Sequence, residues 1–208
     1  MFSMRGQFNG ILVAAFVAAG MQAQSPDVRI DSPKVRVLVA TEQPHHRSAL
    51  HEHKMNRVMV YLGNGEMEFT TPNGAVEKRQ FKAGQVVWTP ATGPHTSENI
   101  GDRPFQIVEI ELNGPPSGPA PESKLDPAKV DSKHYSLEFE NDQVRVLRVR
   151  FGPREKGVLH DHKLDHIVVY LTDQARGKAG EVKLDGPMTH TEENPLDHAV
   201  ERIAIDLK

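Results

Sequence analysis

An internal repeat constrains this chain more than any other feature, because two copies of one unit must fold alike. The copies share three segments at matching positions: Val35-Arg36-Val37-Leu38 with Val144-Arg145-Val146-Leu147, His51 and His53 with His160 and His162, and Val60-Tyr61-Leu62 with Val169-Tyr170-Leu171. One offset relates all three segments without a gap. We infer that one ancestral unit was duplicated and that the chain folds as two related lobes.

A proline-rich segment separates the two copies. Its prolines are Pro115, Pro116, Pro119, Pro121 and Pro127, with Gly and Ser among them. Proline cannot donate a hydrogen bond to a sheet and interrupts helices, so this composition predicts a linker. The expected organisation is a first lobe over residues 28–113, a linker over 114–133 and a second lobe over 134–208.

Apolar residues recur with a period of two in short runs, which is typical of strands. Val58, Val60 and Leu62 form one such run, and turn residues separate it from the next. Many short strands predict an antiparallel β fold, in which a sandwich or small closed barrel protects the sheet edges best. The second copy is shorter, because Thr172–Gly177 stands where the first copy has Gly63–Phe81 with its hairpin-like centre. We therefore expect the second lobe to lack about one hairpin.

The N-terminal residues have the pattern of a secretory signal peptide. Arg5 precedes a short apolar run, Ile11–Gly20, and small residues follow before Gln24. The run is too short to span a bilayer, so we expect a signal peptide over residues 1–23 and a periplasmic or secreted protein without membrane contact after cleavage. A buried helix or a membrane anchor is the alternative interpretation of this segment.

The charge pattern argues against nucleic-acid binding. The chain has 25 Lys and Arg against 28 Asp and Glu, and these residues are interspersed without a long basic block. It has no cysteine, which excludes thiolate metal ligands and disulfides.

Each copy contains a His-x-His pair, His51/His53 and His160/His162. Residues two apart on a strand point to the same face, so each pair can present two imidazoles to one metal. A further histidine follows in each copy, His95 and His190, as a third nitrogen ligand. Imidazole suits zinc, copper, nickel and iron. Histidines that merely line a polar barrel end are the alternative.

These spacings resemble the two motifs of the cupin superfamily, G(x)5HxH(x)3-4E(x)6G and G(x)5PxG(x)2H(x)3N. The second motif is matched in the first copy by Gly84, Pro90, His95 and Asn99, with Gly93 one position late, and in part in the second copy by Gly180, His190 and Asn194. The resemblance covers residues 31–112 and 140–207. It implies an all-β chain of two double-stranded β-helix, jelly-roll-like lobes.

The position of the family's glutamate ligand departs from the motif in both copies. Arg57 occupies it in the first copy, so the resemblance implies a three-histidine site there, and His166 occupies it in the second, which adds a fourth nitrogen to His160, His162 and His190. Arginine cannot ligate a metal and stays charged, so we expect Arg57 to bind an anionic ligand, with Tyr61 as a further substrate contact. Alternatively, Arg57 points outward or pairs with Glu66 or Glu68.

Two functions stay open at this point. The chain is either a metalloenzyme, such as a cupin oxygenase or isomerase that uses iron, manganese, nickel or zinc, or a non-catalytic binding or structural cupin in which metal is absent or only stabilising. A small anionic molecule is the expected ligand. We also expect a homodimer, because a partner would cover the exposed edge of the second lobe.

Overall fold

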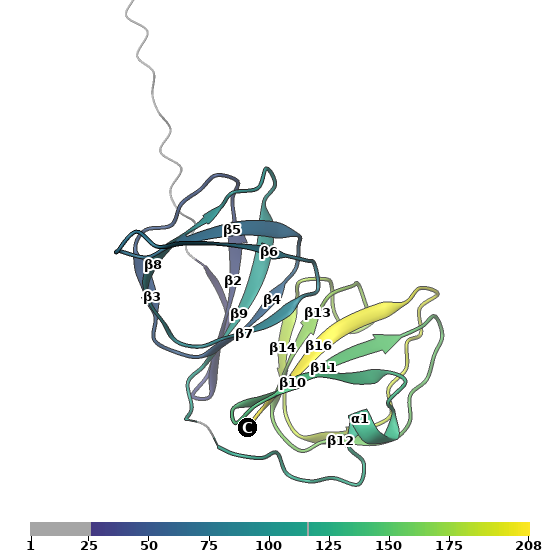
Figure 1. The fold of residues 1–208 in the computed structure, drawn as a ribbon. Coiled ribbons are helices and arrows are strands. Elements are labelled where there is room, and N and C mark those ends of the chain that lie inside the picture. The colour runs from purple at the N-terminus through teal and green to yellow at the C-terminus, as the bar shows by residue number, and fades with distance from the viewer. Residues whose placement is uncertain (1–25, 116) are drawn as a thin grey trace, which may run out of the picture.

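The computed structural model describes residues 26–115 and 117–208, so the predicted signal peptide lies outside the described residues. The prediction of an all-β fold with jelly-roll-like lobes is confirmed (Figure 1). The first lobe contains β1 (Asp27–Asp31), β2 (Val35–Glu42), β3 (His51–His53), β4 (Arg57–Tyr61), β5 (Gly65–Thr70), β6 (Val76–Phe81), β7 (Val86–Thr89), β8 (Thr92–Asn99) and β9 (Phe105–Leu112). After it come α1 (Pro127–Val130), β10 (Tyr135–Glu140), β11 (Val144–Phe151), β12 (His160–His162), β13 (His166–Tyr170), β14 (Val182–Asp185), β15 (Met188–His190) and β16 (Val200–Leu207).

Each lobe has one five-stranded antiparallel sheet, and the two sheets have corresponding strand orders. The order is β1-β2-β9-β4-β7 in the first lobe and β10-β11-β16-β13-β14 in the second. The opposite layer differs, because the first lobe has the four-stranded sheet β3-β8-β5-β6 and the second has the pair β12-β15. The β5–β6 hairpin turns at Gly74, whose φ of 84° is in the region that favours glycine.

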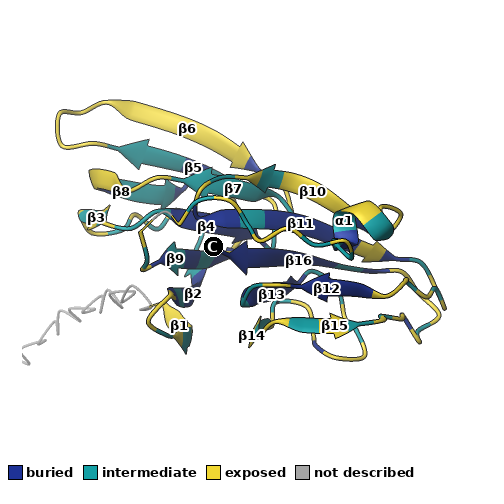
Figure 2. Cartoon of the chain, turned by 90° about the horizontal axis from the view of Figure 1, so that it is seen from below, coloured by how far each residue is buried: buried dark blue, intermediate teal, exposed yellow. Residues whose placement is uncertain are grey.

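The largest hydrophobic cluster lies between the lobes rather than inside either one. Val58 and Val60 of β4 and Val169 of β13 belong to this shared cluster, whereas Met59 and Tyr61 of β4 belong to a separate cluster in the first lobe. Strands such as β4 and β13 are therefore buried on both faces, as Figure 2 shows. The alternating valines recognised in the sequence face the other lobe.

Polar contacts fix the two lobes against each other. Asn56 donates a hydrogen bond of 2.6 Å to the side chain of Gln143, and Arg148 donates one of 2.7 Å to the carbonyl oxygen of Gly84. The packing is reciprocal: a Cβ at Gly84 would lie 3.4 Å from Leu171, and a Cβ at Gly180 would lie 3.5 Å from Leu62.

The segment predicted as a linker packs against the second lobe and contains α1. Asp126 caps this short helix by accepting a hydrogen bond from the Ala128 amide at 3.0 Å, and Pro127 suits the first helical position. Asp126 also accepts a 2.8 Å hydrogen bond from Arg145 of β11. Among the described residues, no helix has the length and hydropathy that a bilayer crossing requires.

Candidate metal centre

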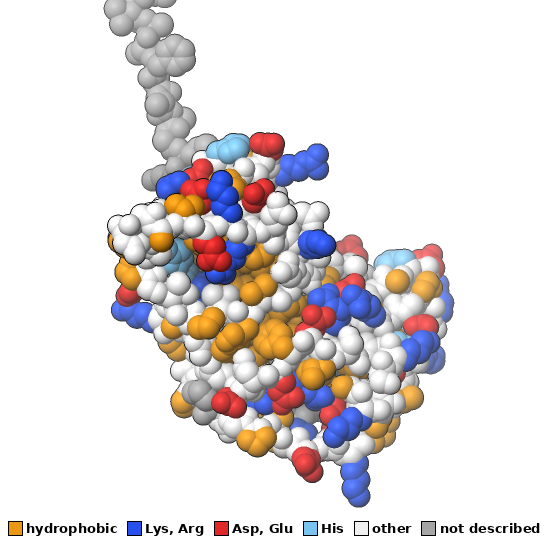
Figure 3. Space-filling model, viewed as in Figure 1, with side chains coloured by type: hydrophobic (Ala, Val, Ile, Leu, Met, Phe, Trp, Pro, Cys, Tyr) orange, Lys and Arg blue, Asp and Glu red, His pale blue; other side chains and the backbone are white. Residues whose placement is uncertain are grey.

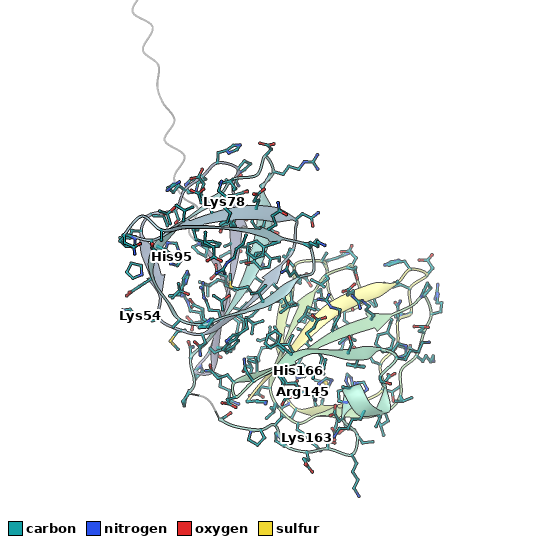
Figure 4. The ribbon with its side chains drawn as sticks, in the orientation of Figure 1. Lys54, Lys78, His95, Arg145, Lys163 and His166 are labelled. Atoms are coloured by element: carbon teal, nitrogen blue, oxygen red, sulfur yellow. The ribbon has the colours of Figure 1, made fainter. Side chains whose placement is uncertain are left out.

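Three imidazoles meet in the first lobe. His51 and His53 lie on β3, and His95 lies opposite His51 on the adjacent strand β8. Figure 4 labels His95 in the first lobe. One ring nitrogen from each lies within 4.8 Å of the other two, and the ring centroids are 4.6 to 5.5 Å apart. Imidazoles that bind one ion at about 2.1 Å place their ring centres roughly 5 Å apart, so the three side chains fit a single metal.

Backbone carbonyl groups orient two of these rings. The Nδ1–H group of His51 donates to the carbonyl oxygen of Ala49 at 2.9 Å, and that of His95 donates to the carbonyl oxygen of Gly93 at 2.8 Å. Each ring therefore keeps the Nε2 lone pair for a ligand bond. Burial, followed by the charge of Arg57 and the nearby imidazoles, lowers the pKa of His53 to about 3. The His53 imidazole is thus uncharged at pH 7 and can offer a nitrogen lone pair to a metal.

Arg57 lines the same cavity as the three histidines. Its side chain is 5% exposed and donates a 2.9 Å hydrogen bond to Glu109 of β9. The alternative prediction, that Arg57 points outward or pairs with Glu66 or Glu68, is therefore wrong. Glu68 pairs instead with Arg47 and Lys78. The Nε–H group of Arg57 is buried without a hydrogen-bond partner among residues 26–115 and 117–208.

The cavity has a volume of about 850 Å³. Figure 3 shows hydrophobic and histidine side chains in a hollow of the first lobe. Tyr61 also lines the cavity, but its ring stacks on Phe81 with centroids 3.9 Å apart, and burial raises its pKa. Burial and the charge of Glu109 raise the pKa of Glu42, which makes this carboxyl a candidate proton donor within the cavity.

Glu42 and Glu109 were missed in the sequence. A signal was present for Glu109, because it follows Phe105 and Ile107 at the alternate positions of β9 that point into the lobe. A carboxylate at such a position requires a buried partner, and Arg57 is that partner.

The second lobe repeats the arrangement with one difference. His160 and His162 of β12 and His190 of β15 also bring their ligand nitrogens within 4.8 Å of one another. The His160 Nδ1–H group donates to the Val158 carbonyl oxygen at 2.9 Å, but its Nε2 lies 3.0 Å from the hydroxyl group of Tyr135.

Polar side chains fill the interior of the second lobe. The Tyr135 hydroxyl donates to Glu192 at 2.5 Å, and Glu192 forms an ion pair with Arg202 of β16. The cavity beside His162 and His190 is consequently only about 60 Å³. This cavity is much smaller than the one in the first lobe.

The four predicted histidines of the second lobe do not form one group among the described residues. They divide between two overlapping groups that share His162: one contains His160 and His190, and the other contains His166 and Asp206. The His166 ring stacks on the His162 ring, with centroids 4.4 Å apart. Burial and the neighbouring His162 lower the pKa of His166, which keeps it a neutral imidazole.

The asparagine at the end of the second motif is structural in both lobes. Asn99 is fully buried, and its amide donates to the carbonyl oxygens of Glu42 at 3.0 Å and Arg103 at 2.9 Å. Asn194 makes the equivalent bonds to Gly152 and His198. These amides hold the chain segments that follow β8 and β15.

Comparisons with known proteins find cupin domains. A family model described as a cupin domain matches residues 38–111. A cupin domain from Bordetella pertussis Tohama I is 30% identical over 43% of this chain and 93% of its own, with a TM-score of 0.41. A search of curated proteins finds no match.

Two further structures match across both lobes. A cupin 2 conserved barrel domain protein from Leptotrichia buccalis is 14% identical over 88% of each chain, with a TM-score of 0.56. An oxalate decarboxylase from Bacillus subtilis is 12% identical over 84% of this chain and 69% of its own, with a TM-score of 0.60. At such identities the likeness concerns the fold alone. The matched cupin domain and the 30% identity to the Bordetella cupin domain, of which this chain covers 93%, show that the chain belongs to the cupin superfamily.

Proposed function

We propose that this chain is an exported cupin whose first lobe binds one divalent metal through His51, His53 and His95 and takes a small anionic molecule at Arg57. One observation carries the proposal: the three imidazoles and Arg57 line a single cavity of about 850 Å³. That volume accommodates a small organic molecule beside the ion. Iron, manganese, nickel and zinc all suit such a donor set.

The anionic class of the ligand follows from the hydrogen bonding of Arg57. A guanidinium group has five N–H donors, and the buried Nε–H group of Arg57 has no partner. A carboxylate is the group that best satisfies such a donor beside a divalent ion. The raised pKa of Glu42 also favours its neutral form, which reduces the repulsion that an entering anion would meet.

The chemistry proposed for this cavity is that of a metal-dependent oxygenase or isomerase. A divalent ion on three neutral donors supplies Lewis acidity and keeps open coordination positions. In this proposal Arg57 holds the anionic group of the ligand, and Glu42, which lines the same cavity and has a raised pKa, exchanges a proton with the ligand. The second candidate is a non-catalytic binding or structural cupin, which the existing Arg57–Glu109 ion pair favours because that pair already balances the charge.

Metal analysis of the protein purified without chelators tests the proposal. We expect His95→Ala to lose one bound ion per chain, and His198→Ala, which changes an exposed histidine of the second lobe, to keep it. Ion content that is equal in the two variants would refute the first-lobe site.

Ligand binding is tested on the metal-loaded protein. A panel of small mono- and dicarboxylates should include members that raise the melting temperature of the native chain but not of Arg57→Met. Equal stabilisation of both proteins would refute the role of Arg57. If no carboxylate acts while metal removal lowers the melting temperature, the structural candidate is correct.

Export and self-association are separate parts of the proposal. The sequence from Arg5 to Gly20 supports export to the periplasm or outside the cell, and mass spectrometry of the mature N-terminus tests it. The exposed edge strand β6, which belongs to the first lobe and not to the second lobe named in the prediction, supports a homodimer, and sedimentation measurements test it.

A further inference from the structure

Two buried polar atoms of the second lobe face each other and have no hydrogen-bond partner in the part of the chain that the structure describes. They are Nδ1 of His162 and Oδ1 of Asp206, 3.8 Å apart, on side chains that are 5% and 10% exposed. This distance is too long for a hydrogen bond. Leaving both atoms unsatisfied costs about 1–3 kcal/mol each, so the pair requires a group between them.

His166 completes the arrangement. The ligand atoms of His162, His166 and Asp206 all lie within 4.8 Å of one another. The His166 Nδ1–H group donates to the Leu164 carbonyl oxygen at 3.3 Å, which leaves its Nε2 lone pair available. Two ligands on one ion at about 2.1 Å are roughly 3 to 4 Å apart, which matches the separation of His162 and Asp206.

We propose that His162, His166 and Asp206 form a buried divalent-cation site, distinct from the point where His160, His162 and His190 converge. Two imidazoles and one carboxylate suit zinc, iron or manganese. The proposal is independent of the first lobe and of the anionic ligand proposed there.

The strand register shows which residues of the first lobe correspond to His166 and Asp206. His166 pairs with Asp206 across β13 and β16, and the corresponding pair across β4 and β9 is Arg57 with Glu111. Glu111 is balanced by Arg36 at 3.3 Å. In the second lobe the imidazole of His166 stands where the first lobe has the guanidinium group of Arg57. This position therefore offers two metal ligands, His166 and Asp206.

Arg145 and Lys163 pair with carboxylates other than that of Asp206, so Asp206 can bind a cation. Arg145 pairs with Asp126 at 2.8 Å, and Lys163 pairs with Asp161 at 2.8 Å. Among the described residues, no Lys or Arg lies within 4.0 Å of the Asp206 carboxylate. The Asp206 carboxylate is therefore not neutralised by a Lys or Arg side chain of the described residues and can bind a cation.

A route to the site exists on the linker side. A cleft of about 360 Å³ is lined by His162, Asp206, Arg145, Lys163 and residues 120–123 and 126–129. In Figure 4, His166 lies near Arg145, with Lys163 beyond them toward the linker. An ion can therefore enter without passing through the filled interior of the lobe.

Tyr135 crowds the alternative site at which His160, His162 and His190 converge. Nδ1–H of His160 already donates to Val158, and the Tyr135 hydroxyl oxygen lies 3.0 Å from Nε2, so an ion bound to His160 would have to share that space. His190 Nε2 is, however, also buried without a partner, so the two arrangements must be separated by experiment.

The test uses the full chain with His51→Ala and His95→Ala, which removes the first-lobe site and keeps the two proposals distinguishable. Zinc content after dialysis should be one ion per chain. Asp206→Asn should weaken zinc binding by more than about 100-fold, because losing a ligand should exceed the 10–100-fold cost of losing an outer contact. His190→Gln should keep the ion.

Cobalt substitution gives a second measurement. The visible absorption of Co²⁺ in the same background should change in Asp206→Asn and stay unchanged in His190→Gln. Loss of the ion in His190→Gln alone, zinc binding unaffected by Asp206→Asn, or no ion in the background protein would each overturn the proposal. If Asp206→Asn does not melt cooperatively, His166→Gln replaces it with the same expected loss.

Discussion

Neutralising Glu109 should destabilise the metal-free protein, because it leaves the Arg57 guanidinium group buried and unpaired. The two side chains are 5% and 13% exposed and lie 2.9 Å apart. Removing one partner of a buried ion pair costs about 3–5 kcal/mol. We expect about 3 kcal/mol for Glu109→Gln, the low end, because the pair borders a cavity that admits water. For a chain of this size, that corresponds to a fall of about 6–12 °C in melting temperature.

A double-mutant cycle measures the interaction directly. Urea unfolding of chelator-treated native protein, Glu109→Gln, Arg57→Met and the double variant should give a coupling energy of about 2–3 kcal/mol, because the double variant buries no unpaired charge. The matched control is Glu98→Gln. Glu98 contacts Arg47 at 2.7 Å, but these side chains are 21% and 48% exposed, so we expect a cost below about 1 kcal/mol.

The reasoning is refuted if Glu109→Gln costs no more than the control, or if the coupling energy is below about 1 kcal/mol. Either result would mean that water solvates Arg57 in the folded state. Glu109→Gln should also tighten carboxylate binding in the metal-loaded protein, because it releases a second edge of the guanidinium group.

Three further variants or conditions test other parts of the structure. Asn99→Ala should cost about 3 kcal/mol of unfolding free energy because it leaves buried carbonyl groups unsatisfied; urea unfolding with a cost under about 1 kcal/mol would contradict this. Ile110→Ala in the shared core should cost about 2–5 kcal/mol, whereas the exposed Leu137→Ala should cost little; similar melting temperatures would argue against the packing between lobes. The pKa of His53 is about 3 in the folded protein and near 6.5 in the unfolded chain, so the unfolded chain binds more protons between these values. The metal-free protein should therefore lose stability as the pH falls below 6.5. A melting temperature that stays constant down to pH 4.5 would contradict this.

The apolar alternation predicted the strands but not what each strand face contacts. In β4, Val58 and Val60 contact the other lobe, and Met59 and Tyr61 contact the interior of their own. Both surroundings are apolar, so a period of two identifies the strand without telling these surroundings apart. Only the pairing of the two five-stranded sheets assigns the faces.

The histidine pairs were predictable because side-chain parity on a strand is local. His51 and His53 had to share a face, and the motif spacing placed His95 near them. The partners that decide the chemistry come from distant strands. Glu109, Tyr135 and Asp206 contact the site residues through the register of β9, β10 and β16, which no local pattern specifies.

The two lobes differ in the side chains that fill their interiors. Tyr61 is paired across the sheet with Ile107 in the first lobe, and Tyr170 is paired with Arg202 in the second. A buried arginine needs a counter-charge, which Glu192 provides, and Glu192 in turn accepts the hydrogen bond of Tyr135. This network brings the Tyr135 hydroxyl group to the free lone pair of His160. A molecule that filled this interior would have to displace the buried Arg202–Glu192 ion pair, at about 3–5 kcal/mol. The Arg57–Glu109 pair of the first lobe borders a cavity that is already open, so the first-lobe cavity is the one for which we propose a ligand.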